Sequence, residues 1–279
     1  MKIFDCHRHF MFGKADVAVL LQQLKNDDIN KTVLFGYHGV KLFDEAHEQD
    51  KRILMFAKKH PQQIVPFFCD IDFYAPDAFE YARSCASEKQ FYGMGELLFG
   101  HTPTHRQSFK GRSMTDKECI KIFRLMGEYG LPVLFHADPS FMTEAKKMLK
   151  LCPETNFIWA HMAYDFCAEY GGCSINPDEI KFFLLSYPNL YFDISLWKIS
   201  PTYLYENVWI RTLEKFSNRF LLGFDMSENY LLESAWVCAY KNILNMLTTE
   251  SQTRIAGGNL MSLLPHHSDI SNSLTHHPH

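Results

Sequence analysis

The chain has 279 residues, of which 47% are hydrophobic and 15% aromatic, enough apolar material for one large α/β domain. Its formal net charge is −4 and it has no dense cluster of lysine and arginine, which disfavours nucleic-acid binding. No apolar run reaches the roughly 18 residues of a membrane span, and the first residues are charged too early for a signal peptide. The eight cysteines are scattered without a C-x-x-C motif, which predicts a cytoplasmic protein with reduced thiols.

Short apolar runs alternate with longer amphipathic stretches along the chain. The predicted strands begin near Ile3, Thr32, Ile64, Tyr92, Pro132, Phe157, Leu190 and Phe220. The predicted helices are Ala15–Leu24, Phe43–Lys59, Asp77–Ser87, Thr115–Tyr129, Ser140–Leu151, Pro177–Ser186, Tyr203–Phe216 and Leu231–Leu247. This succession predicts an α/β fold, a (β/α)8 TIM barrel in a single domain. The alternative is a doubly wound sheet, but Gly93-x-Gly95 lacks the third glycine of a nucleotide fingerprint.

The end of the chain differs in composition from the rest. Residues 265–279 hold five histidines together with serine and asparagine. We predict a flexible His-rich tail there, which follows a barrel domain of residues 1–264. A tail without fixed geometry is a poor preorganised metal site.

The opening stretch runs from Lys2 to His9 and ends in His7-x-His9. Residues two apart in a strand point to the same side, so both imidazoles aim at one place where the strand ends. Converging imidazoles are typical of a site for a divalent transition metal. A chance occurrence is the alternative in a chain with 14 histidines.

Other predicted strands also end in polar groups. The fourth ends at Glu96, the fifth at His136, the sixth at His161 and the eighth at Asp225. Each has a structural explanation of its own: a core histidine, an arginine partner for Glu96, or a helix cap for Asp225. Together with His7 and His9 they would form an uncompensated polar cluster at the active face of a barrel, which a metal would resolve.

In this order, the six groups resemble the ligand set of the amidohydrolase superfamily of metal-dependent hydrolases. Phe4-Asp5-Cys6-His7-Arg8-His9, Trp159-Ala160-His161 and the stretch from Ile255 to Leu264 resemble its amidohydrolase 2 branch. In that branch a Gly-Asn-x-x-x-Leu pattern closes the domain with a terminal helix. Gly95-Glu96 is instead similar to the TatD-type branch, whose strand-four glutamate binds metal.

Three positions depart from the superfamily pattern. Phe224 precedes Asp225, where serine or threonine is usual. No lysine stands at the end of the fourth strand to form a carboxylated bridge between two metals, which makes Glu96 the candidate bridge. Pro139 stands where the deaminase branch has a glutamate, and this disfavours deamination.

The resemblance implies a metal-dependent hydrolase that uses a metal-activated water to cleave an amide, ester or lactone bond of a small molecule. Asp225 would be a ligand and the acid–base residue, and His161 either a ligand or an electrophilic helper. His7, His9, His136 and Glu96 would complete the ligand set. These ligand types suit zinc, with manganese or iron as alternatives, and either one or two ions.

Substrate contacts are expected in the loops that follow the strands. The candidates are Arg8, His38, Arg106, Trp197 and Lys198. Arg106 or Lys198 would suit a substrate carboxylate or phosphate. Exposed loop charges without a function are the alternative for these positions.

Three other functions stay open at this stage. They are decarboxylation of an unsaturated or aromatic acid, a TatD-like deoxyribonuclease, and a non-catalytic barrel that serves as a scaffold. The acidic charge balance disfavours the nuclease, and the complete ligand set disfavours the scaffold. Trp209 and Trp236 are candidates for a homodimer interface, with core packing as the alternative.

Overall fold

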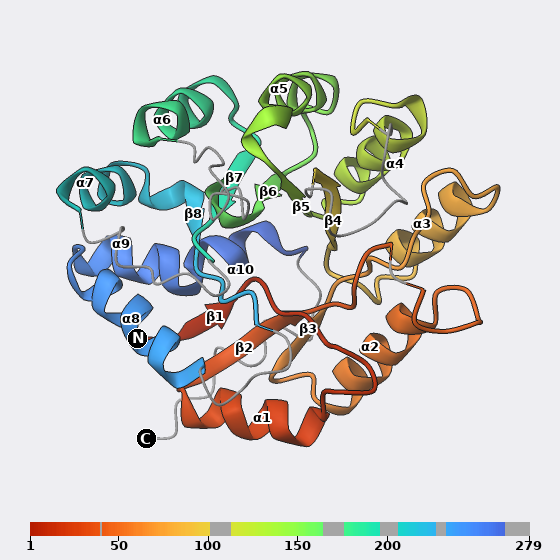
Figure 1. Ribbon diagram of the computed structural model, residues 1–279, viewed down its shortest axis with the longest axis horizontal. Coiled ribbons are helices and arrows are strands. Elements are labelled where there is room, and N and C mark those ends of the chain that lie inside the picture. Colours follow the sequence, from red (N-terminus) through yellow and green to blue (C-terminus); the bar gives the residue numbers. More distant parts are fainter. Residues whose placement is uncertain (40, 101–112, 164–175, 196–205, 227–232, 266–279) are drawn as a thin grey trace.

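The computed structural model describes residues 1–39, 41–100, 113–163, 176–195, 206–226 and 233–265, in which helices surround a ring of parallel strands (Figure 1). The strands are β1 (Ile3–Asp5), β2 (Ile29–Leu34), β3 (Ile64–Pro66), β4 (Met94–Gly100), β5 (Val133–Ala137), β6 (Phe157–Trp159), β7 (Leu190–Asp193) and β8 (Phe220–Leu221). The helices are α1 (Val17–Asn26), α2 (Glu48–Lys59), α3 (Ala78–Ser87), α4 (Lys117–Glu128), α5 (Met142–Leu151), α6 (Pro177–Ser186), α7 (Asn207–Lys215), α8 (Glu233–Asn245), α9 (Thr249–Thr253) and α10 (Asn259–Leu263).

Two parallel sheets, β1–β2–β3 and β4–β5–β6–β7–β8, join at both edges to close the barrel. At the junction of β3 and β4, the Phe68 N–H donates to the Gly93 carbonyl at 3.2 Å. At the junction of β8 and β1, the Asp225 N–H donates to the His7 carbonyl at 2.9 Å. The (β/α)8 barrel predicted from the sequence is therefore confirmed.

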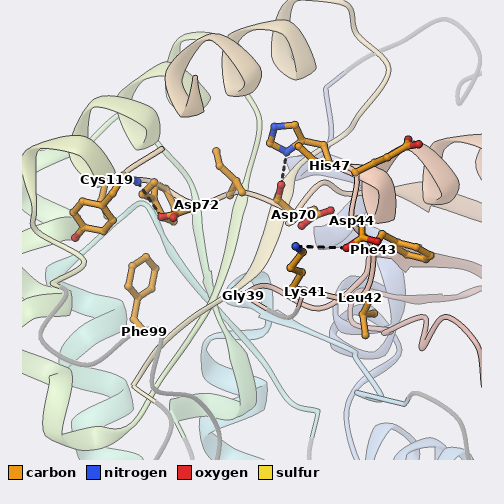
Figure 2. Close-up of a pocket in the computed structure, with 15 residues that line it drawn as sticks. Gly39, Lys41, Leu42, Phe43, Asp44, His47, Asp70, Asp72, Phe99 and Cys119 are labelled. Carbon is orange, nitrogen blue, oxygen red and sulfur yellow. Dashed lines mark hydrogen bonds and ion pairs between the residues drawn. The ribbon is translucent and has the colours of Figure 1, made fainter. Parts of the chain in front are cut away.

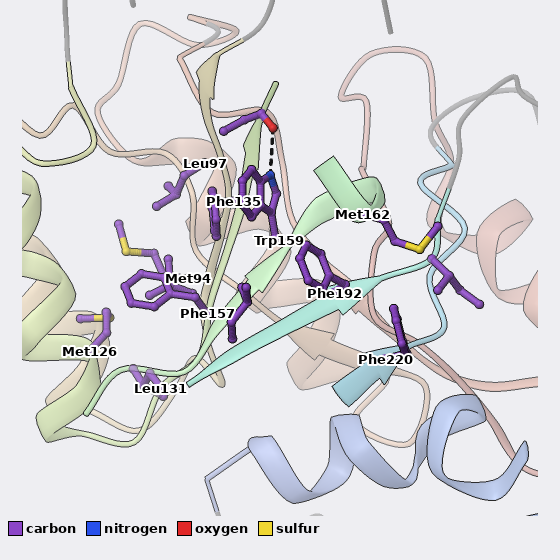
Figure 3. Close-up of a cluster of buried hydrophobic side chains, with 14 of the residues drawn as sticks. Met94, Leu97, Met126, Leu131, Phe135, Phe157, Trp159, Met162, Phe192 and Phe220 are labelled. Carbon is purple, nitrogen blue, oxygen red and sulfur yellow. Dashed lines mark hydrogen bonds between the residues drawn. The ribbon is translucent and has the colours of Figure 1, made fainter. Parts of the chain in front are cut away.

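Alternate strand residues face two different cores, as the two-residue period of a strand requires. Phe135, Phe157, Trp159 and Phe192 belong to the outer core between the strands and the helices (Figure 3). The inner core fills the barrel and includes Phe4, Val33, Val65, Leu134, Ile158 and Leu221. On β5, the same alternation that places Leu134 inside also places His136 inside.

The terminal helix α10 closes one end of the barrel. Leu260 and Leu263 belong to the inner core. The Asn259 side chain donates to the carbonyls of Ser217 and Phe220, each at 2.7 Å, where β8 begins. The amino-terminal end of the barrel is therefore sealed, and the opposite end is left for a site. This helix confirms the one expected from the Gly-Asn-x-x-x-Leu pattern.

Most predicted helix ends lie within two residues of the observed ones wherever both are described. The predicted start of α2 at Phe43 is wrong, because the helix begins at Glu48. His47 precedes it with a φ of 59°, a left-handed conformation that interrupts the helix. Nearly all of the predicted tail lies outside the described residues, and the domain boundary at residue 264 stays a prediction. No helix in the described ranges is long and apolar enough to cross a bilayer.

Candidate metal centre at the carboxyl ends of the strands

The six predicted ligands meet at the carboxyl end of the barrel, and all six are buried. They come from five strands: His7 and His9 follow β1, Glu96 lies in β4, His136 in β5, His161 after β6 and Asp225 after β8. Because the strands are parallel, their carboxyl ends reach one region despite large separations in sequence.

His7 and His9 form the first half of the site. Their Nε2 atoms lie 3.4 Å apart, so the two rings converge as the i, i+2 spacing predicts. Asp225 Oδ1 lies 3.3 Å from the His7 Nε2 atom and 3.4 Å from that of His9. Glu96 Oε2 lies 3.2 Å from the His9 Nε2 atom. We call these four groups the first donor set.

His136 and His161 form the second half. Glu96 Oε1 lies 3.5 Å from His136 Nδ1 and 3.4 Å from His161 Nε2. Asp225 Oδ2 lies 3.7 Å from His161 Nε2. These groups are the second donor set. Glu96 and Asp225 each turn one oxygen toward each set, which is the arrangement of two bridging carboxylates.

Hydrogen bonds on the outer side of the histidine rings determine which ring nitrogen faces the donor groups of the site. The Nδ1–H of His9 donates to the Gly36 carbonyl at 2.9 Å, and that of His161 donates to the Ser195 carbonyl at 3.0 Å. A carbonyl oxygen only accepts, so the hydrogen of each neutral ring is on Nδ1 and the Nε2 lone pair points into the site. Lone pairs presented in this way are what a metal ligand requires.

The charges of the site stabilise one another. Burial disfavours the charged form of His7, but the carboxylates of Glu96, Asp225 and Asp193 outweigh it and raise the pKa of His7 well above its usual range. Burial likewise opposes ionisation of Glu96, yet the neighbouring histidines hold the pKa of Glu96 well below its usual range. The site is thus built around anionic carboxylates that attract positive charge.

The donor set fits a divalent cation. Three groups of buried histidine and acidic side chains bring their ligand atoms within 4.8 Å of one another, among them His7, His9 and Asp225. Glu96 Oε1 is buried and accepts no hydrogen bond within the described part of the chain. An acceptor of this kind is costly to bury unless a cation satisfies it. Imidazole nitrogen with carboxylate oxygen is a ligand set that zinc accepts.

Arg8 and His38, two of the predicted substrate contacts, are buried and make hydrogen bonds within the fold. Arg8 is buried, and its Nε–H donates to Asp5 Oδ2 at 2.8 Å. The His38 Nε2–H donates to the Ile71 carbonyl at 3.1 Å, while its Nδ1 accepts from the Leu98 N–H at 3.0 Å. A substrate contact would require His38 to give up one of these two bonds. Arg106, Trp197 and Lys198 lie outside the described residues.

Three buried polar residues of the site are not among those predicted from the sequence. Asp138 Oδ1 lies 3.4 Å from His136 Nε2, and with Glu96 it raises the pKa of His136 to about 9 against the opposing effect of burial. Asp193 and Ser195, at the end of β7, contact His7 and His161. The i, i+2 rule that identified His7 and His9 would have found Asp193-x-Ser195, because an apolar strand ends there too.

The family model described as amidohydrolase, Amidohydro_2, matches residues 4–259, which include β2 to β8, most of β1 and all six donors. The chain belongs to the amidohydrolase family. This superfamily is metal-dependent, in agreement with the donor groups of the site. A search of curated proteins finds no significant match.

Solved structures similar to this amidohydrolase share its fold at low sequence identity. An uncharacterized TIM-barrel protein of Bordetella bronchiseptica has a TM-score of 0.70 at 13% identity, and 94% of this chain and 98% of that chain are covered. A probable 2-pyrone-4,6-dicarboxylic acid hydrolase of Acinetobacter baumannii has a TM-score of 0.66 at 14% identity, with 94% and 99% covered. A 2,6-dihydroxybenzoate decarboxylase of Rhizobium has a TM-score of 0.61 at 14% identity, with 94% and 98% covered.

The amidohydrolase also has a pocket of about 500 Å³ beside the barrel rim (Figure 2). Its walls come from the segment before α2, the segment after β3, the end of β4 and α4. Aromatic rings of Phe43, Phe73, Tyr74 and Phe99 line it together with charged groups such as Lys41. None of the six donors lines this pocket. Phe99 lies on β4, three residues after Glu96.

Proposed function

We propose that this amidohydrolase is a metal-dependent hydrolase that cleaves an amide, ester or lactone bond of a small molecule. One observation carries the proposal: Glu96 and Asp225 lie between two pairs of buried histidines, with an oxygen of each carboxylate facing each pair. The family match supports it, as does the fold shared with the probable 2-pyrone-4,6-dicarboxylic acid hydrolase. The acidic net charge again disfavours a nucleic-acid substrate.

The two donor sets would hold two divalent cations, for which zinc is our proposal. His7 and His9 would bind one ion, and His136 and His161 the other, with Glu96 and Asp225 shared between them. A bound cation of this kind supplies Lewis acidity, which makes water acidic near neutral pH and polarises a substrate oxygen.

Asp225 is placed to move protons in the reaction. It would accept a proton from the attacking water at its carboxylate and later deliver that proton to the leaving group. For His161 we favour the role of ligand over that of electrophilic helper. Its Nδ1–H bond to Ser195 leaves Nε2 without a hydrogen in the neutral ring, so the ring has nothing to donate to a substrate oxygen there.

Decarboxylation of an unsaturated or aromatic acid is the second candidate. The fold shared with a dihydroxybenzoate decarboxylase favours it, as do the aromatic rings of the neighbouring pocket. In this reaction Asp225 would take up a proton from solvent and deliver it to the substrate carbon whose bond to the carboxylate group breaks, which releases carbon dioxide. Release of carbon dioxide from an aromatic acid, with no turnover of lactones, esters or amides, would establish this alternative.

Metal content tests the site itself. We expect about two equivalents of zinc or manganese in the full chain, the same in a chain that ends at Leu264, and a loss of metal in the His7→Ala/His9→Ala variant. Elemental analysis measures all three, and the shortened chain controls for metal on the histidines of the tail. One equivalent would contradict the shared-carboxylate arrangement, and none after reconstitution would contradict the metal-dependent function.

Asp225→Asn tests the proton transfer. We expect turnover of the best small-molecule substrate to fall by about 10²-fold or more in a metal-replete sample, because an amide cannot accept the proton of water. Steady-state kinetics with metal content measured on the same preparation make the comparison. Unchanged turnover would remove Asp225 from the mechanism.

A further inference from the structure

We propose that Asp193 and Ser195 are positioning residues that hold His7 and His161 in the orientation needed to bind metal, so that one carboxylate on β7 supports both donor sets. The inference rests on the proposed metal-dependent function. Neither residue would touch substrate; each would act through the rings of His7 and His161.

Asp193 serves both histidines with its two oxygens. It is completely buried at the end of β7. Its Oδ2 accepts from the His7 Nδ1–H at 2.8 Å, and its Oδ1 accepts from the His161 backbone N–H at 3.0 Å. With both oxygens committed to hydrogen bonds, Asp193 acts as an acceptor behind the ligands, although its distances alone would also suit a ligand atom.

The proton of Ser195 fixes the tautomer of His161. The Ser195 Oγ–H donates to Asp193 Oδ1, and a hydroxyl has one hydrogen only. Ser195 Oγ therefore acts as an acceptor toward His161 Nδ1, which lies 2.9 Å away, and the Ser195 carbonyl is a second acceptor at 3.0 Å. His161 must carry its hydrogen on Nδ1, which leaves the Nε2 lone pair for the site.

Asp193 also holds a backbone segment in an unfavourable conformation. The φ values of His161, Met162 and Ala163 are 57°, 51° and 56°, in a left-handed region that residues other than glycine rarely adopt. Such conformations are strained and persist only where other contacts enforce them. The bond from the His161 N–H to Asp193 is a contact of this kind, and it holds the ring where β6 ends.

The test compares zinc affinity in the full-length protein by competition with a chromophoric chelator. We expect Asp193→Asn to weaken zinc binding by about 10- to 100-fold in both donor sets, as loss of an acceptor behind a ligand does. Ser195→Ala keeps the backbone carbonyl that accepts from His161, so its loss should be smaller. Asp50→Asn removes an equally buried carboxylate whose hydrogen bonds go to Cys69, Asp70 and Tyr81 and to none of the donors, and it serves as the matched control.

Histidine-labelled NMR separates positioning from a merely structural role. In the zinc-loaded protein, the Nδ1–H signal of His7 should lie far downfield and move upfield in Asp193→Asn. The signal of His9, which is bound to Gly36, should stay in place. Unchanged zinc affinity, or an unmoved His7 signal, would overturn the inference while leaving the proposed function intact. If Asp193→Asn does not fold, the test uses Ser195→Ala instead. Unchanged zinc affinity together with an unmoved Nδ1–H signal of His161 would then overturn the inference. A wild-type protein that binds no zinc would contradict the proposed function as well.

Discussion

Asp50 shows how a single buried carboxylate shapes the barrel rim from outside the site. It lies on α2, and its Oδ1 accepts from the Cys69 N–H at 2.9 Å. Its Oδ2 accepts from the Asp70 N–H at 3.0 Å and from the Tyr81 hydroxyl at 2.7 Å. These bonds fasten the segment after β3 to α2. Burial raises the pKa of Asp50 to about 7, and the charge of Asp70 adds to this effect against the hydrogen bonds that oppose it.

This shift predicts a pH-dependent stability. The folded state keeps the Asp50 proton up to about pH 7, while the unfolded chain loses it near pH 4. The free energy of unfolding should therefore fall as the pH rises through this window, by at most about 4 kcal/mol from this group. Urea unfolding at pH 4 to 8 measures it, and the difference between wild type and Asp50→Asn isolates it. A difference that does not change with pH would contradict the shift.

At the scale of elements, β4 lies unusually close to its neighbour β5 at Gly95. Gly95 precedes Glu96 and has a φ of 125°. A Cβ atom added there would lie 2.2 Å from the Leu134 carbonyl oxygen, on the neighbouring strand β5. The close approach of β4 to β5 therefore requires glycine, and it brings Glu96 next to His136.

We expect Gly95→Ala to destabilise the protein by more than about 3 kcal/mol, because backbone atoms of β5 cannot yield as a flexible side chain would. The control is Gly130→Ala, where φ is 67° but a Cβ atom would meet nothing within 4 Å, so the cost should be about 1 kcal/mol. Thermal or urea unfolding of both variants makes the comparison. Equal losses would show that backbone conformation, and not the contact with Leu134, decides the cost.

For the whole molecule, the sequence predicts the repeating pattern well and the local exceptions poorly. The period-two runs are enough to predict the barrel, and the polar residues that end them predict which six side chains meet at its carboxyl end; their binding of metal stays a prediction. Arg8 is a different case, because sequence places it beside His7 but says nothing of its bond to Asp5. The start of α2 depends on the left-handed φ of His47, for which the sequence pattern carries no signal. Asp193 also ends an apolar strand, so the rule that identified the six donors would have predicted it as well.

The junction of β8 with β1 has a consequence for the order of folding. His7 lies near the start of the chain and Asp225 more than 200 residues later, yet the Asp225 N–H bonds to the His7 carbonyl. Contacts of such high sequence separation form slowly, since a long loop must close first. On the ribosome, a nascent chain that has not yet reached β8 offers His7, His9 and Glu96 without Asp225, the second of the two shared carboxylates. We therefore expect full affinity for metal only in the finished ring, and metal capture late in the maturation of the enzyme.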